Sequence, residues 1–140
     1  MNSKIALILT TIAVISITSG CICCSIGESV NAIKLAVTNK DAKNCERMED
    51  PIRTACFTSV AISTKNADTC DRIDEEDMII GCYISVAAEK EDPNICEKIK
   101  IQEAHDSCVI QTATHMKNRK ICAILTDQSK KEECVLRARQ

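Results

Sequence analysis

The sequence predicts an all-α fold: a short α-solenoid of about four disulfide-linked helical hairpins, with one extra helix capping its N-terminal end. Eight cysteines recur in pairs, and corresponding members of successive pairs lie 25 or 26 residues apart. The 140 residues include only three Gly and two Pro, too few turn-forming residues for a many-stranded β fold. One Phe, one Tyr and no Trp leave a core of small aliphatic groups, which needs cross-links for stability.

The first 20 residues have the layout of a secretory signal. Lys4 is followed by an uncharged apolar run, and small residues then precede Cys21. The sequence Ser19-Gly20-Cys21 resembles the lipobox of prokaryotic lipoproteins, especially archaeal-type ones, although Thr18 departs from the usual aliphatic residue. This resemblance implies cleavage before Cys21 and lipidation of its sulfur.

Two other interpretations of the N-terminal segment remain open. The uncharged run of 23 residues from Ile5 to Gly27 is long enough to cross a membrane as an uncut anchor. The chain is alternatively an ordinary secreted protein. All three interpretations place the rest of the chain outside the cytoplasm, where disulfides persist. The lipidated form and the uncut anchor both predict that the N-terminus contacts a membrane and that the protein lies at the cell surface.

A tether is predicted over residues 21–27, and the helical repeat domain over residues 28–140. Within that domain, residues 28–38 are expected to form the capping helix. Leu35 and Ala36 match an apolar Val-Ala pair in the later repeats, while Asn31 stands where those repeats have cysteine. A terminal helix of this kind covers the apolar face of the first repeat.

Each repeat is expected to start with a helix of about two turns. Four residues before the first cysteine of each pair stands an Asp or Asn, whose short side chain accepts a hydrogen bond at a helix start. An apolar residue three positions after that cysteine shares its helix face. The predicted N-caps are Asp41, Asn66, Asp92 and Asn118, and the apolar residues are Met48, Ile73, Ile99 and Leu125.

The second helix of each repeat is expected to be longer, about fourteen residues. Apolar residues recur at helical spacing around the second cysteine. These positions are Ile52, Cys56, Phe57, Val60 and Ala61 in the first copy, Met78, Cys82, Tyr83, Val86 and Ala87 in the second, and Ala104, Cys108, Val109, Thr112 and Ala113 in the third. The last copy turns polar, as a terminal repeat without a following neighbour requires.

Two symmetric disulfide pairings are compatible with the repeat. Pairing within copies joins Cys45 to Cys56, Cys70 to Cys82, Cys96 to Cys108 and Cys122 to Cys134. Pairing between copies leaves Cys45 and Cys134 without partners, so we favour the first pattern. A disulfide requires Cα atoms closer than ordinary helix packing allows, and small neighbours at Ala55, Gly81 and Ser107 permit that approach.

Residues 41–138 resemble the Cys-x-x-Ile repeat arrays of uncharacterised secreted proteins from archaea and bacteria. In this sequence the pattern appears as Cys70 followed by Ile73 and as Cys96 followed by Ile99. The resemblance implies a secreted helical array and brings no known activity with it.

An acidic and a basic residue follow the first cysteine in each of the first three copies. Stacking of the copies would align these residues in two parallel ladders. A solvated, self-neutralising face is one interpretation. A binding ridge for a charged peptide or glycan is the other, and its basic residues would be Arg47, Arg72 and Lys98.

Several functional classes lack support in the sequence. A net charge of -2 argues against nucleic-acid binding. No cysteine or histidine spacing indicates a zinc or haem site, and no glycine-rich loop indicates a nucleotide site. His105 and His115 are expected on the surface, and the acidic residues 74–77 form a solvated turn.

The sequence therefore predicts a non-enzymatic binding or structural module that uses no cofactor, takes a protein, peptide or glycan as its partner, and is tethered to a membrane. The alternative is a thiol-based redox or metal-handling lipoprotein that uses Cys23 and Cys24.

Overall fold

The computed structural model describes residues 22–139, and every regular element within that range is a helix. The chain divides into two compact units, residues 1–32 and residues 33–140. Helix α2 (Ile22–Asn39) contains the boundary between them. It begins before residue 28, where the sequence predicts the start of the capping helix.

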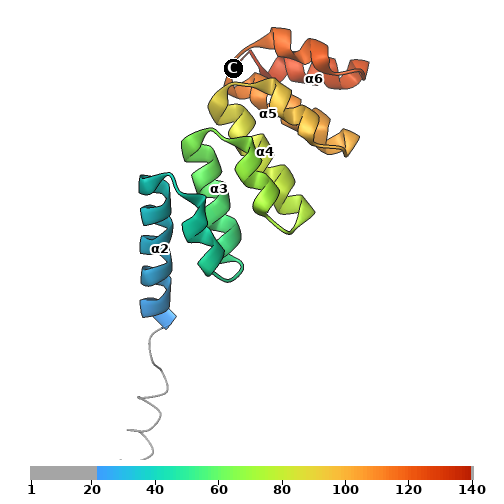
Figure 1. Cartoon of the computed structure of the whole chain (residues 1–140). Helices are drawn as coiled ribbons and strands as arrows, with labels where there is room; N and C mark the ends of the chain where they lie inside the picture. The colour runs from blue at the N-terminus through green and yellow to red at the C-terminus, as the bar shows by residue number, and fades with distance from the viewer. Residues whose placement is uncertain (1–21, 140) are drawn as a thin grey trace, which may run out of the picture. The chain divides into compact units, whose positions relative to one another are not determined.

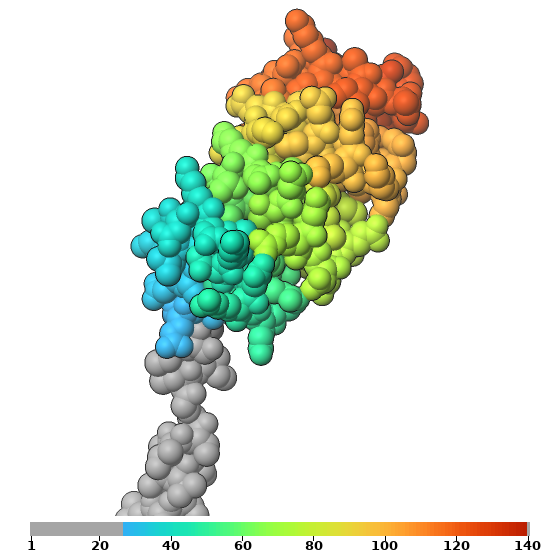
Figure 2. Space-filling view, viewed as in Figure 1, coloured from blue at the N-terminus to red at the C-terminus, as the bar shows by residue number. Residues whose placement is uncertain are grey.

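Residues 33–140 contain four pairs of helices, each made of a short 3-10 helix and the α-helix that follows it (Figure 1). The α-helix of each pair contacts the α-helix of the next pair, and the space-filling view shows the pairs one after another in chain order (Figure 2). The pairs are η1 (Ala42–Arg47) with α3 (Ile52–Thr64), η2 (Ala67–Arg72) with α4 (Glu76–Lys90), η3 (Pro93–Lys98) with α5 (Gln102–His115), and η4 (Arg119–Ile124) with α6 (Gln128–Arg137).

Each short helix begins at the Asp or Asn that the sequence predicts. The side chain of Asp41 accepts a hydrogen bond of 2.9 Å from the backbone N–H of Lys43, and Asn66, Asp92 and Asn118 make the equivalent bond. The helices are 3-10 rather than α-helical, as is common for helices of this length. The apolar residue three positions after the cysteine is the C-cap, and its N–H donates to the carbonyl of that cysteine.

The turns between an α-helix and the following short helix share one backbone conformation. A residue with positive φ follows the last turn of the α-helix in each case. These residues are Lys40, Lys65, Glu91 and Lys117, and their φ angles lie between 50° and 57°. The next residue donates its backbone N–H to the carbonyl of an alanine five positions earlier, as Asn66 does to Ala61 at 3.0 Å. One Asn or Asp therefore ends one helix with its backbone and starts the next with its side chain.

The four disulfides join the two helices of each pair, which confirms the within-copy pairing. Their Cα–Cα distances are 5.6 Å for Cys45–Cys56 and 5.7 Å for Cys70–Cys82, Cys96–Cys108 and Cys122–Cys134. All eight sulfurs belong to fully or almost fully buried residues. The predicted fold class is confirmed over the described residues: an all-α, disulfide-linked stack of helical pairs.

Two residues expected in the core are exposed. Ala36 is buried as predicted and Ile33 and Val37 pack beside it, but Leu35 remains 57% exposed. Met78 is 49% exposed, although it matches the apolar spacing of α4. The predicted core positions are thus confirmed from the second cysteine of each pair onward, as at Phe57 and Val60. The prediction is wrong at the N-terminal turn of α4, where Met78 is exposed.

Candidate binding surfaces

The charged ladders lie across the boundaries between helical pairs. Arg72 of the second pair forms an ion pair with Glu46 of the first pair. Lys98 of the third pair places its Nζ 3.0 Å from Asp68 and 3.3 Å from Asp71 of the second pair. Each cation is therefore neutralised by the preceding pair, so these contacts tie neighbouring pairs together.

The two described aromatic side chains lie beneath the same cations. The guanidinium carbon of Arg72 is 4.9 Å from the centre of the Phe57 ring, and Nζ of Lys98 is 5.5 Å from that of Tyr83. Such cation–π contacts stabilise a charged group whose other face stays in water. The aromatic residues, which the sequence presents only as core positions, thus also support the ladder.

Tyr83 connects the aromatic ring to the ladder. Its hydroxyl donates a hydrogen bond to Asp71, the carboxylate that also pairs with Lys98. Burial of the ring, followed by this hydrogen bond, raises the pKa of Tyr83 to about 12. The pKa of Lys98 is also raised, chiefly by its hydrogen bond with Asp68. Both groups therefore keep their protons at neutral pH.

The ladder ends within the described residues at Arg47 and Glu97. The side chain of Arg47 forms no ion pair with any residue in the described range, and it is exposed. The fourth pair has Ala123 and Ile124 where the others have charges, so it supplies no cation for Glu97. Of the three residues of the predicted ridge, two are already neutralised and one is open to solvent. This geometry favours the self-neutralising interpretation for Arg72 and Lys98.

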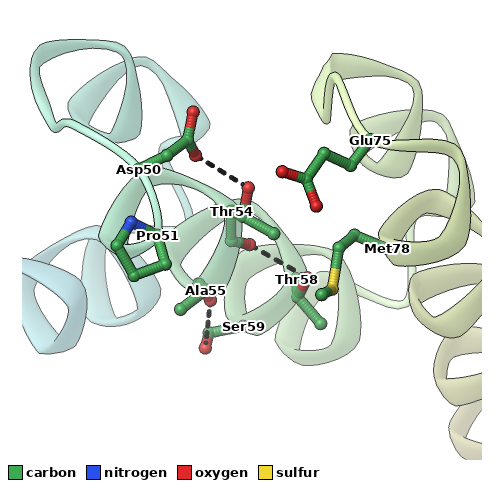
Figure 3. Close-up of a pocket in the computed structure, with 8 residues that line it drawn as sticks. All are labelled: Asp50, Pro51, Thr54, Ala55, Thr58, Ser59, Glu75 and Met78. Atoms are coloured by element: carbon green, nitrogen blue, oxygen red, sulfur yellow. Dashed lines mark hydrogen bonds between the residues drawn. The ribbon is translucent and has the colours of Figure 1, made fainter.

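A groove of about 420 Å³ lies between α3 and α4 (Figure 3). One wall consists of residues at the start of α3, and Met78 extends toward Thr58 from α4. Three hydroxyl groups in this wall are already used as donors: Thr54 to Asp50 at 2.8 Å, Thr58 to the carbonyl of Thr54 at 3.0 Å, and Ser59 to the carbonyl of Ala55 at 2.7 Å. The groove surface is consequently formed mainly by methyl and methylene groups.

Carboxylates stand at one end of this groove. Asp50 accepts from Thr54 and from Arg53, and these hydrogen bonds lower the pKa of Asp50. Arg53 also pairs with Asp74 at 2.5 Å. The carboxylate of Glu75 extends over the groove and has no hydrogen-bond partner among the described residues (Figure 3). Two carboxylates thus share the single guanidinium of Arg53, and Glu75 adds a further negative charge, which leaves this end of the groove negative.

A second groove, of about 460 Å³, occupies the equivalent place between α5 and α6. Counted from the second cysteine of each pair, most of its lining residues match those of the first groove, whereas Glu133 and Arg137 have no counterpart there. Charged residues replace apolar ones: Glu103 stands in the position of Pro51, and Lys130 in that of Met78. The two grooves share a backbone frame and differ in chemistry.

Asp106 is the central residue of the second groove. Its side chain is only 4% exposed and accepts hydrogen bonds from Lys130 at 2.8 Å and Gln102 at 2.7 Å. Burial raises the pKa of Asp106, but the hydrogen bonds from Lys130, His105 and Gln102 outweigh it and the pKa is lowered. The carboxylate is therefore charged, and each of its two oxygens accepts a hydrogen bond.

The structure corrects the expectation that His105 lies on the surface. Its side chain is 19% exposed, and its Nδ1 lies 3.3 Å from Asp106. His115 is exposed, as predicted.

No group of three or more His, Cys, Asp or Glu side chains in the described part of the chain has a metal-binding arrangement. None of the described helices is long and apolar enough to cross a membrane. The predicted signal segment 1–20 and the predicted lipidation site Cys21 lie outside the described residues. The side chains of Cys23 and Cys24 also lie outside them.

Comparison with known proteins adds no assignment to this geometry. No family model, no curated protein and no solved structure matches this chain.

Proposed function

We propose that this chain is a non-enzymatic, extracytoplasmic binding module that presents the grooves between its helical pairs to a partner protein. The supporting observation is the contrast between inward and groove positions. Inward positions keep one character through the first three pairs, as with the buried alanines Ala61, Ala87 and Ala113. Groove positions of the same register change from apolar to charged, as with Met78 and Lys130. Repeat scaffolds that bind macromolecules combine a constant interior with a varied surface.

The four disulfides indicate an oxidising environment outside the cytoplasm. We further propose that the module is held at the cell surface through its N-terminus, by a lipid on Cys21 or by an uncut apolar segment. One acyl chain alone binds a membrane only marginally, so a lipid anchor requires a second acyl chain or another contact.

A thiol-based function is the second candidate. All eight repeat cysteines are in disulfides and Cys21 is the proposed lipidation site, so thiol chemistry would fall to Cys23 and Cys24. Counting free thiols on the native protein separates the two candidates. A count of zero reactive thiols would support the binding module. A count of two would support the redox or metal-handling role.

Site-specific photo-cross-linking in the native host tests the binding module. A photoreactive phenylalanine analogue would replace Ser59 in the first groove or Gln111 in the second. Lys43, an exposed residue on η1, provides the control position. We expect an adduct of defined mass from at least one groove position and none from Lys43. Absence of adducts from both grooves, with the protein folded and correctly located, would contradict the proposal.

A further inference from the structure

We infer that the groove between α3 and α4 binds the side chain of a lysine on the partner protein. This inference deepens the proposed function, because it specifies the chemistry that one of the two grooves recognises. A lysine side chain has a long apolar stem and a terminal cation. The groove offers matching surfaces for both parts.

The apolar part of the groove fits the stem. Pro51 and Ala55 line it on one side, and Met78 faces them from α4 (Figure 3). The hydroxyls of Thr54, Thr58 and Ser59 already donate hydrogen bonds to acceptors at residues 50–55, so an apolar ligand stem does not have to displace them. A volume of about 420 Å³ lies within the range of small-ligand sites. An alkyl chain placed here releases water from both surfaces.

The acidic end of the groove fits the ammonium group. Glu75 extends over the groove without a partner among the described residues, and Asp50 is held in its charged form by Thr54 and Arg53. Arg53 neutralises only part of the charge of Asp50 and Asp74, between which it lies. An incoming cation therefore meets an excess of negative charge, and an incoming carboxylate is repelled.

The groove between α5 and α6 lacks this character. At the position equivalent to Met78 it has Lys130, whose ammonium group is already bonded to Asp106. Arg137, paired with Glu133, adds a second cation. The second groove thus presents two cations beside its carboxylates, whereas none of the described residues that line the first groove is a cation. The inference is thus specific to the first groove, and the second groove serves as its internal comparison.

The test is an NMR titration of the full chain, with disulfides intact, using n-pentylammonium as a mimic of the lysine side chain. Isotope-labelled methionine methyl groups report on the site. Met78 lies in the groove, while Met48 and Met116 pack against the core elsewhere. We expect a saturable shift of the Met78 signal and unchanged Met48 and Met116 signals. The neutral n-pentanol should bind more weakly.

Two variants of equal charge separate the site from the general acidity of this region. Glu75→Gln removes the carboxylate over the groove, and we expect it to weaken binding roughly two- to fivefold, as for an exposed ion pair. Glu76→Gln removes the next carboxylate, which does not line the groove, and should leave binding unchanged. An unshifted Met78 signal, equal binding of n-pentanol, or equal loss in both variants would overturn the inference.

The titration and the cross-linking experiment test separate proposals, so either one can fail without the other. An adduct from Ser59 without n-pentylammonium binding would leave the binding module standing and remove lysine recognition. Binding of n-pentylammonium without adducts from either groove would contradict the proposed function, and with it the role of the groove as a partner site.

Discussion

Tyr83 is the only tyrosine of the chain, so its titration is directly visible in near-ultraviolet absorbance. Burial and the hydrogen bond to Asp71 raise its pKa from 10.0 to about 12, because both favour the neutral phenol. The folded state keeps this proton while the unfolded state loses it. The stability from Tyr83 is therefore complete below pH 10.0 and is lost as the pH rises toward about 12.

We expect phenolate formation in the folded protein near pH 12, accompanied by falling stability above pH 10. Asp71→Asn should lower the pKa of Tyr83, because the charged acceptor is lost while burial of the ring remains. Asp77→Asn, which removes an exposed carboxylate on α4, should not change it. If the Tyr83 phenol of the folded wild-type protein titrated near its ordinary pKa of 10.0, its burial and its hydrogen bond to Asp71 would be contradicted.

Asp106 produces the opposite pH dependence. Its pKa is lowered from 3.8, since the hydrogen bonds from Lys130, His105 and Gln102 outweigh burial. Its contribution to stability is therefore present above pH 3.8 and is lost as the pH falls through the lower folded value. Asp106→Asn should cost about 1–3 kcal/mol at neutral pH, because the charged acceptor of Lys130 is removed.

Urea unfolding at several pH values measures this effect. We expect the difference in stability between wild type and Asp106→Asn to narrow as the pH falls below 3.8, and to vanish below the lower folded pKa, where Asp106 is also neutral. Asp77→Asn should stay close to wild type throughout. A constant difference across the pH range would show that the cost arises from packing rather than from charge.

The helix ends carry a backbone cost that substitution can remove. Glu91 ends α4 with φ 57°, a conformation that costs a non-glycine residue roughly 1–2 kcal/mol. A negative charge at a helix C-terminus is also unfavourable. Glu91→Gly should stabilise the protein by about 0.5–1 kcal/mol, because the greater freedom of glycine in the unfolded chain offsets part of the gain.

The neighbouring residue provides the control for this substitution. Lys90 is the last residue of α4 and lies within the helix, so Lys90→Gly should destabilise by about 1 kcal/mol. Denaturant unfolding of both variants measures the two effects. Equal destabilisation by the two glycines would disprove the assigned role of Glu91.

The sequence predicts the helix starts better than the helix ends. Asp41, Asn66, Asp92 and Asn118 are conspicuous because capping depends on side-chain chemistry. The positive-φ ends are not predicted, because they contain Lys or Glu in place of the usual Gly or Asn. Backbone bonds to buried alanines, such as Asn66 to Ala61, define those ends, and they leave no clear signal in residue type.

The candidate site is predicted less well than the fold. The spacing of Arg72 and Lys98 indicates a ladder, but only the stacked pairs show that each cation meets the carboxylate of the preceding pair. The α3–α4 groove depends on how Thr58 directs its hydroxyl and how far Met78 extends. Helical periodicity assigns Met78 to the core because it cannot distinguish a buried turn from one that borders a groove.

At the scale of the whole molecule, we predict that reduction unfolds the array. The bridges span 11 or 12 residues each. Each is worth roughly 3 kcal/mol in the chain-entropy model, so four together rival the whole stability of a domain, about 5–15 kcal/mol. The far-ultraviolet helical signal at 37 °C should be lost on adding a reductant and kept with the same reagent in oxidised form. A reduced chain that remains helical would contradict this prediction.

Because every bridge lies within one helical pair, no covalent bond other than the backbone joins one pair to the next. Tension on an anchored chain would therefore detach pairs one at a time. Between Cys82 and Cys96 the backbone can straighten over 14 residues, about 50 Å, while the bridged segments stay closed. The molecule would lengthen in short, nearly equal steps and then refold locally.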